Sequence, residues 1–144
     1  MHYNMELDFS QKNNLMFDRL KKHHIGIIVE KKEIPGIEKI IGKQFHLDTI
    51  QGTRVLFIKD ISNNFFIEYI VKEGRAKNLS IGYSHTCYEV EDYEKFLKIE
   101  KFIIKDKNGY AITKLEKSNS KECNLIKFYF VKNLGLIEIN LLKK

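Results

Sequence analysis

The chain has 144 residues, of which 43% are apolar and 31% are charged, and its formal net charge is +6 at pH 7. This length and balance predict one folded domain that can bury a core of its own. The only two cysteines, Cys87 and Cys123, are far apart, which argues against a disulfide scaffold. The lysines are scattered along the sequence, whereas nucleic-acid-binding proteins more often gather basic residues on one face, so we expect no nucleic-acid partner.

Membrane insertion is not expected either. No apolar run approaches the ~18 residues that a membrane-spanning helix needs. Residues 1–14 lack a basic head followed by an apolar run, so they do not have the pattern of a signal peptide. We therefore expect a cytoplasmic protein with no membrane partner.

The N-terminal third of the sequence begins with a weakly patterned stretch. Residues 1–20 are polar, and we interpret them as an N-terminal arm or a short helix ahead of the domain. A short apolar strand is predicted at residues 24–29. Residues 33–42 carry apolar side chains at helical spacing, with Pro35 in the first turn and Gly42 just past the end, which predicts a short helix.

Three more strands complete the first half of the chain. They are predicted at residues 45–49, 54–59 and 65–71, and are separated by turn sequences. The first half therefore follows the plan strand, helix, strand, strand, strand, and we define it as module one, residues 21–72. A polar linker, residues 73–83, follows it.

The same plan then restarts in module two, residues 84–144. It opens with a strand at residues 85–90 and a helix at residues 91–99. The remaining predicted strands lie at residues 102–105, 110–115, 125–131 and 136–142. A plan that occurs twice predicts two modules that bury their faces on each other within a single domain, residues 21–144.

Each module opens on a strand that begins with a histidine and closes on an apolar strand that contains one glutamate. These residues are His24 and Glu68 in module one, and His85 and Glu138 in module two. Two neutral imidazoles and two carboxylates are a suitable ligand set for one divalent metal ion. A glutamate among apolar neighbours is unfavourable to bury unless it is paired. The alternative for each residue alone is a solvent-facing glutamate or a hydrogen-bonded structural histidine.

The segments around these residues resemble a known superfamily. The most informative are His24-Ile25-Gly26-Ile27-Ile28-Val29, Ser84-His85-Thr86-Cys87-Tyr88-Glu89-Val90-Glu91-Asp92 and Lys132-Asn133-Leu134-Gly135-Leu136-Ile137-Glu138. They are similar to the vicinal oxygen chelate superfamily, which includes glyoxalase I, methylmalonyl-CoA epimerase, extradiol dioxygenases and fosfomycin- and bleomycin-resistance proteins. The resemblance covers residues 23–142 and is greatest to the branch that contains glyoxalase I and the epimerase.

The resemblance implies an α+β fold in which paired βαβββ modules form a curved, open, barrel-like sheet. It also implies that His24, Glu68, His85 and Glu138 converge on one divalent metal ion, with nickel, cobalt, zinc, manganese and iron all suitable. His24 rather than His23 matches the first ligand, because it stands immediately before the apolar run, as His85 does. Since side chains alternate along a strand, we expect His23 to point away from the site.

The activity implied by the resemblance is that of a glyoxalase I-like, metal-dependent lyase or isomerase. Such an enzyme moves a proton between adjacent carbons through a metal-bound enediolate, with Glu138 as the better candidate for the base and Glu68 opposite it. The alternatives are a methylmalonyl-CoA epimerase-like isomerase and a non-catalytic, resistance-type protein that only binds a small molecule. The expected partners are an anionic thioester or a hemithioacetal as substrate, and a second copy of the chain in a homodimer.

Two features depart from the pattern of the superfamily. The epimerase branch carries a separate general-base glutamate on the third strand of its first module, but the matching position here falls near Val55. The segment at residues 72–84 is also short and lacks proline, where a longer loop usually covers the substrate. Arg54 is a candidate for holding an anionic group of the substrate, or else a surface residue.

Overall fold

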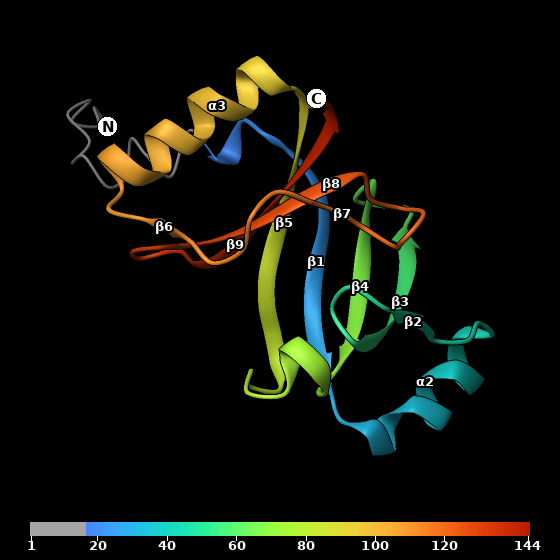
Figure 1. The fold of residues 1–144 in the computed structure, drawn as a ribbon. Helices are drawn as coiled ribbons and strands as arrows, with labels where there is room; N and C mark the ends of the chain where they lie inside the picture. Colours follow the sequence, from blue (N-terminus) through green and yellow to red (C-terminus); the bar gives the residue numbers. More distant parts are fainter. Residues whose placement is uncertain (1–16) are drawn as a thin grey trace, which may run out of the picture.

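The computed structural model describes residues 17–144, which form one continuous curved sheet with two α-helices (Figure 1). Most of the N-terminal arm that we predicted at residues 1–20 lies outside the described residues. The strands and helices in chain order are β1 (Lys21–Val29), α2 (Ile34–Ile41), β2 (His46–Asp48), β3 (Thr53–Asp60), β4 (Phe65–Val71), β5 (Gly82–Asp92), α3 (Tyr93–Lys101), β6 (Tyr110–Ala111), β7 (Glu116–Lys117), β8 (Leu125–Val131) and β9 (Gly135–Lys143).

The sheet joins the two halves of the chain edge to edge. Its strand order is β2-β3-β4-β1-β5-β9-β8-β6, and β7 pairs with β8. In each half the first strand runs parallel to the last, so β1 pairs with β4 and β5 pairs with β9. The two first strands pair antiparallel at the centre of the sheet. The predicted α+β fold of paired βαβββ modules is therefore confirmed, and the first and last strands of both modules lie next to one another.

Helix α3 packs on one face of the second half of the sheet. The side chain of Asp92 caps the helix by accepting a hydrogen bond of 2.9 Å from the backbone N–H of Lys95. The helix then directs Phe96 and Ile99 into the largest apolar core. The other buried members of this core are Phe17, Tyr88, Val90, Ile103, Tyr129, Val131, Ile137, Ile139 and Leu141.

Helix α2 lies at the opposite end of the molecule from α3 (Figure 1). It has the proline in its first turn and ends at Gly42, whose φ of 78° is the left-handed conformation that glycine adopts without strain. The predicted helix is thus confirmed, but none of its side chains is buried.

One predicted strand is wrong, and the strand predicted at residues 110–115 is limited to Tyr110–Ala111. We expected a strand at residues 102–105, but Phe102–Asp106 extends α3 as a π-helical turn, in which the N–H of Lys107 bonds the carbonyl of Phe102. Ile103 follows Phe96 and Ile99 at helical spacing and is fully buried in the same core. Packing of that side chain therefore overrides the strand preference of the Phe-Ile-Ile sequence.

No helix within residues 17–144 is long and apolar enough to cross a membrane.

Candidate metal centre

The four predicted ligand residues come from the four adjacent central strands. Gly26 of β1 pairs with Glu68 on β4 and with His85 on β5. His24, two residues before Gly26, lies opposite Cys87, and Cys87 lies opposite Glu138 on β9. Because paired residues share a face and faces alternate along a strand, all four side chains project from one side of the sheet.

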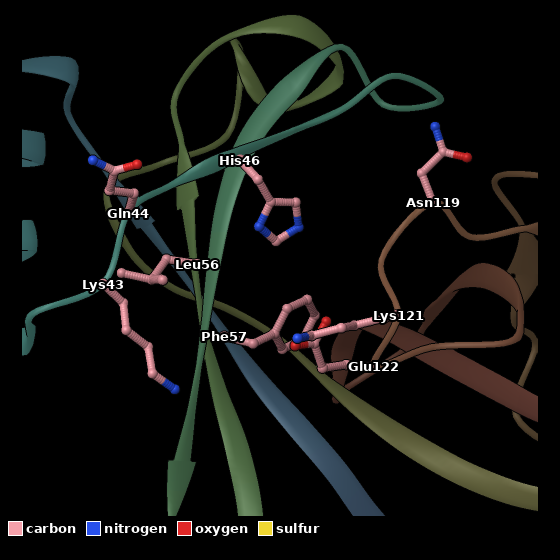
Figure 2. Close-up of a pocket in the computed structure, with 8 residues that line it drawn as sticks. All are labelled: Lys43, Gln44, His46, Leu56, Phe57, Asn119, Lys121 and Glu122. Atoms are coloured by element: carbon pink, nitrogen blue, oxygen red, sulfur yellow. The ribbon is translucent and has the colours of Figure 1, made fainter.

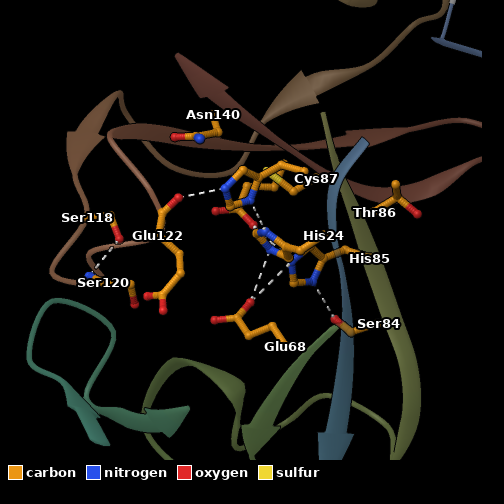
Figure 3. Close-up of polar contacts among 12 residues, drawn as sticks. His24, Glu68, Ser84, His85, Thr86, Cys87, Ser118, Ser120, Glu122 and Asn140 are labelled. Atoms are coloured by element: carbon orange, nitrogen blue, oxygen red, sulfur yellow. Dashed lines mark hydrogen bonds and ion pairs between the residues drawn. The ribbon is translucent and has the colours of Figure 1, made fainter. Parts of the chain in front are cut away.

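The donor atoms of these side chains lie close together. The Nε2 atom of His24 is 3.1 Å from Oε1 of Glu68 and 2.9 Å from Oε1 of Glu138. The Nε2 atom of His85 is 2.9 Å from the same Glu138 oxygen and 4.0 Å from Oε1 of Glu68. One ligand atom from each residue lies within 4.8 Å of the others, and Figure 3 shows the imidazoles and the Glu68 carboxylate directed toward a common point.

The four predicted ligand residues are deeply buried. His24, Glu68, His85 and Glu138 expose between 1% and 5% of their surface. Within residues 17–144, the ion pairs of both carboxylates are with imidazoles and none is with a lysine or arginine. Two carboxylates buried in this way need a positive charge beside them.

The imidazole of His24 and the carboxyl of Glu138 stabilise each other's charged forms. Burial opposes the charge on His24, but the acidic groups around it, first Cys87 and then Glu138, outweigh burial and raise its pKa well above 6.5. Burial likewise opposes the charge on Glu138, but the two imidazoles lower its pKa below 4.5. A metal ion that binds here would therefore compete with a proton for His24.

Two neighbouring residues hold the ring of His85 in place. The Oγ atom of Ser84 lies 3.1 Å from its Nδ1 atom, which leaves Nε2 directed at the carboxylates. On β1, Gly26 lies against the face of the ring, and a Cβ added there would lie 2.6 Å from Nδ1 of His85. A side chain larger than hydrogen at position 26 would therefore displace this imidazole.

The predicted orientation of His23 is wrong. The pairing of β1 with β5 shifts register between Lys22 and His24, as at a β-bulge. The shift interrupts the alternation of side chains, so His23 is also buried, and its Nδ1 atom lies 2.8 Å from Nδ1 of His24. Burial and the neighbouring His24 lower the pKa of His23 below 6.5. Period-two spacing could not reveal this contact, because a bulge leaves little trace in the sequence.

A segment of module two closes one side of the centre. We define residues 118–124 as the cover segment. The Nε2 atom of His23 lies 2.6 Å from the carbonyl oxygen of Glu122. The N–H of Asn124 donates to Oδ1 of Asn140 on β9 at 2.8 Å. Burial raises the pKa of the Cys123 thiol, which neighbours His24, to about 12. The segment that covers the site thus comes from module two, whereas the resemblance placed the covering loop at residues 72–84.

Two of the cavities near the centre bear on the position of a substrate. A cavity of about 150 Å³ reaches His85 directly. Its lining is mainly apolar and includes Ile70, Leu79, Ile112, Phe128 and Leu136, with Arg75 and Gln51 at its polar side. A wider one of about 440 Å³ lies between β3 and the cover segment (Figure 2). The ring of Phe57 lines this wider cavity and packs against His24 with 5.3 Å between centroids, so it separates the cavity from the imidazole.

Neither Val55 nor Arg54, the two remaining candidate positions, brings a charged group to the cluster of predicted ligands. Val55 is fully buried and lies opposite Ile70, so β3 brings no carboxylate to the site at this position. Arg54 forms a two-pronged ion pair with Glu73, at 2.8 and 2.9 Å. Of the two roles considered for Arg54, its contacts support that of a surface residue.

Comparison with known proteins identifies the fold. The sequence matches no family model and no curated protein. The structure is similar to methylmalonyl-CoA epimerase from Mycobacterium tuberculosis, with a TM-score of 0.61 and 15% identity over 84% of this chain and 87% of that one. It is also similar to a methylmalonyl-CoA epimerase in complex with methylmalonyl-CoA and NH4+, with a TM-score of 0.57 and 18% identity over 85% of this chain and 94% of that one.

A third similar structure is a hypothetical protein from Bacillus halodurans, with a TM-score of 0.60 and 17% identity over 88% of this chain and 96% of that one. Identities this low show a common fold and leave the activity open. The expected resemblance is confirmed at that level: the chain has the fold of the vicinal oxygen chelate superfamily.

Proposed function

We propose that this protein is a metal-dependent isomerase that removes and returns a proton on the carbon next to a thioester carbonyl. The observation that carries the proposal is the convergence of His24, Glu68, His85 and Glu138 from four central strands. Similar structures include methylmalonyl-CoA epimerases, one of them in complex with methylmalonyl-CoA, and this supports a thioester as the first substrate class to test.

The donor set fits a first-row divalent metal ion, and nickel, cobalt, zinc, manganese and iron remain the candidates. The four side chains would be its ligands, and their two carboxylates would balance its charge. When bound, such an ion would polarise the carbonyl oxygen of the substrate and stabilise the negative charge that develops there during proton removal.

The base in this proposal is one of the two ligand carboxylates, because Val55 occupies the position of the separate base. Both Glu68 and Glu138 are catalytic candidates, and their contacts divide the roles. Glu138 contacts both imidazoles at 2.9 Å, whereas Glu68 contacts His24 at 3.1 Å and lies 4.0 Å from His85. The resemblance favoured Glu138 as the base, but on these contacts we assign proton removal to the less tightly held Glu68, and Glu138 keeps the two imidazoles in place.

The cavity beside His85 is the proposed position of the acyl group. Its volume of about 150 Å³ and its apolar lining suit a short acyl chain whose polar end faces the ligand residues. The wider cavity is the less suitable position, because Phe57 stands between it and His24.

The test combines metal analysis with proton exchange. Purified protein is incubated with cobalt or nickel, desalted and analysed for metal, and then mixed with methylmalonyl-CoA in deuterated water. We expect about one equivalent of metal, and metal-dependent exchange of the α-proton that falls by about 100-fold or more in Glu68→Gln. Loss of metal in the Glu68→Ala, Glu138→Ala double variant should accompany loss of exchange.

Two results would contradict this proposal. If the protein takes up no metal, it has the fold but no metal-dependent activity, and the alternative of a non-catalytic protein that binds a small molecule is favoured. A metal-loaded protein that catalyses no exchange on the thioester would exclude the epimerase-type substrate.

A glyoxalase I-like lyase is the second candidate, and a specific observation favours it. With valine at the position of the separate base, both carboxylates of the site belong to the ligand set, and a ligand carboxylate that acts as base suits the isomerisation of a hemithioacetal. The same metal-loaded protein is therefore assayed with hemithioacetals of methylglyoxal. Turnover of these and not of the thioester would select the lyase.

A further inference from the structure

We infer that His23 is a positioning residue that sets the tautomer of His24 and thereby directs its Nε2 lone pair at the metal. The two rings and the cover segment form a continuous chain of hydrogen bonds. Nε2 of His23 lies 2.6 Å from the carbonyl oxygen of Glu122, and Nδ1 of His23 lies 2.8 Å from Nδ1 of His24.

The position of each proton in this chain follows from the acceptor at its end. A backbone carbonyl only accepts hydrogen bonds, so Nε2 of His23 carries a proton and donates it to Glu122. In a neutral imidazole the other nitrogen then has a lone pair, so Nδ1 of His23 accepts. The proton between the rings consequently belongs to Nδ1 of His24. The Nε2 atom of His24 then faces Glu68 and Glu138: in the metal-free protein it donates to these carboxylates as part of an imidazolium, and after loss of that proton it would offer its lone pair to a metal ion.

The backbone geometry is arranged for this contact. The register shift between Lys22 and His24 places two consecutive side chains in the interior, where a regular strand would send one of them to the other face. The ring of His23 is 8% exposed and packs beside Phe66 with 5.5 Å between centroids. Because His24 is almost fully buried, its Nδ1–H would lose this acceptor if His23 were absent.

We call the hydrogen-bonded chain from His24 through His23 to the Glu122 carbonyl the relay. It also connects the metal centre to the cover segment. The terminal acceptor, the carbonyl of Glu122, belongs to residues 118–124 and comes from module two, whereas both histidines are on β1 of module one. His85 is oriented differently, by the hydroxyl of the adjacent Ser84 at 3.1 Å. The orientation of His24 therefore depends on where the cover segment lies, and that of His85 does not.

This inference rests on the proposed function only in treating His24 as a metal ligand. Three variants test it: His23→Leu, His23→Gln and, as a control, His46→Leu, which removes an exposed histidine of β2. In His23→Gln the amide NH2 can donate to the Glu122 carbonyl while the amide oxygen accepts from His24, so the relay is restored. In His23→Leu both hydrogen bonds are lost.

The first measurement is the Co2+ dissociation constant of each variant, together with its thermal unfolding. We expect His23→Leu to bind Co2+ about 10–100-fold more weakly than the original protein, and His23→Gln and His46→Leu to stay within about threefold. Equal Co2+ affinities for all variants would overturn the relay. So would equal weakening in His23→Leu and His23→Gln, because that would indicate packing and not hydrogen bonding.

The second measurement is independent of metal binding and of the variants. Nitrogen-15 NMR of the metal-free protein reports which ring nitrogens carry protons. The relay requires His23 with a proton on Nε2 and none on Nδ1, and His24 with a proton on Nδ1. A proton on Nδ1 of His23 would overturn the inference. If the protein failed to bind Co2+, the proposed function would fail, and this spectrum would still decide on the relay.

Discussion

Gly26 of β1 lies against the imidazole of His85, so closely that a Cβ added to the glycine would lie 2.6 Å from Nδ1 of the ring. The backbone of Gly26 has no positive φ, so the close approach alone is the structural reason for glycine at this position. The strand that carries one proposed ligand residue, His24, therefore also makes room for another, His85 on β5.

We predict that Gly26→Ala weakens metal binding at least tenfold. The added methyl displaces the His85 ring from Glu138, and the crowding itself destabilises the fold by roughly 1–3 kcal/mol. A Co2+ titration and a denaturant unfolding curve measure the two effects. Gly36→Ala is the matched control, because a Cβ at Gly36 meets no atom within 4 Å. Equal metal affinity in Gly26→Ala and the original protein would show that His85 is no ligand.

The free energy of unfolding of the metal-free and metal-loaded proteins should respond to pH in opposite ways. Because the pKa of His24 is raised in the folded protein, its protonation stabilises the fold. This stabilisation is complete below pH 6.5 and is lost as the pH rises through the pKa of His24 in the folded state. The lowered pKa of Glu138 contributes stability that is present above 4.5 and is lost as pH falls below it. The metal-free protein should therefore be most stable between these limits and lose stability on the alkaline side.

Metal binding reverses the alkaline trend, because the ion competes with the His24 proton and binds more tightly as pH rises. At a metal concentration 100 times the dissociation constant, we expect the melting temperature to rise by roughly 5–10 °C. Melting curves from pH 5 to pH 9, with and without Co2+, measure both trends. Glu138→Gln should abolish the response to Co2+, and a full response in that variant would contradict the ligand assignment.

The ion pair of Arg54 and Glu73 should stabilise the fold only while Glu73 is ionised. The Arg54 guanidinium, above all through its hydrogen bonds, lowers the pKa of Glu73 to about 2. Because the folded value is lowered, the stabilisation is present above 4.5 and is lost as pH falls toward 2. Glu73→Gln should reduce the unfolding free energy by about 1 kcal/mol at pH 7, since the pair is partly exposed.

The control for this pair is Glu94→Gln. Glu94 and Lys98 form an ion pair of 3.9 Å on α3, and their side chains are 86% and 75% exposed, so this variant should change stability by less than about 0.5 kcal/mol. Denaturant curves at pH 7 and pH 4 compare the variants. A loss in Glu73→Gln that does not shrink below pH 4.5 would mean that packing, not charge, holds the pair.

Asn140 should hold the cover segment against β9. Its Oδ1 atom accepts the N–H of Asn124 at 2.8 Å, and its side chain is fully buried. Asn140→Ala leaves that N–H without an acceptor, which we expect to destabilise the protein by about 1–3 kcal/mol and to increase hydrogen exchange at residues 118–124. Asn124→Ala is the control, because it removes an exposed side chain and keeps the backbone N–H. Unchanged exchange in Asn140→Ala would exclude this anchoring role.

The sequence predicted most of the individual elements because their signals are local. Strands β4 and β8 have the predicted bounds, and α2 ends at the predicted glycine. One exception, Phe102–Asp106, is a segment whose residues favour a strand but whose buried Ile103 belongs to the packing surface of α3. Burial of Ile103 against residues that are distant in the sequence outweighs this local preference for a strand.

The sequence by itself determined the repeated plan of strands and helix, and it marked the residue types suited to a metal, because alternation, helix caps and residue chemistry are properties of neighbours along the chain. Only the tertiary structure decided the rest: the pairing of β1 with β5, the bulge that brings His23 beside His24, and the use of residues 118–124 as the cover. These depend on strand register and on contacts between residues such as His23 and Glu122, which are 99 positions apart. Such contacts leave no periodic signal, because register is set by how the two modules bury their faces against each other.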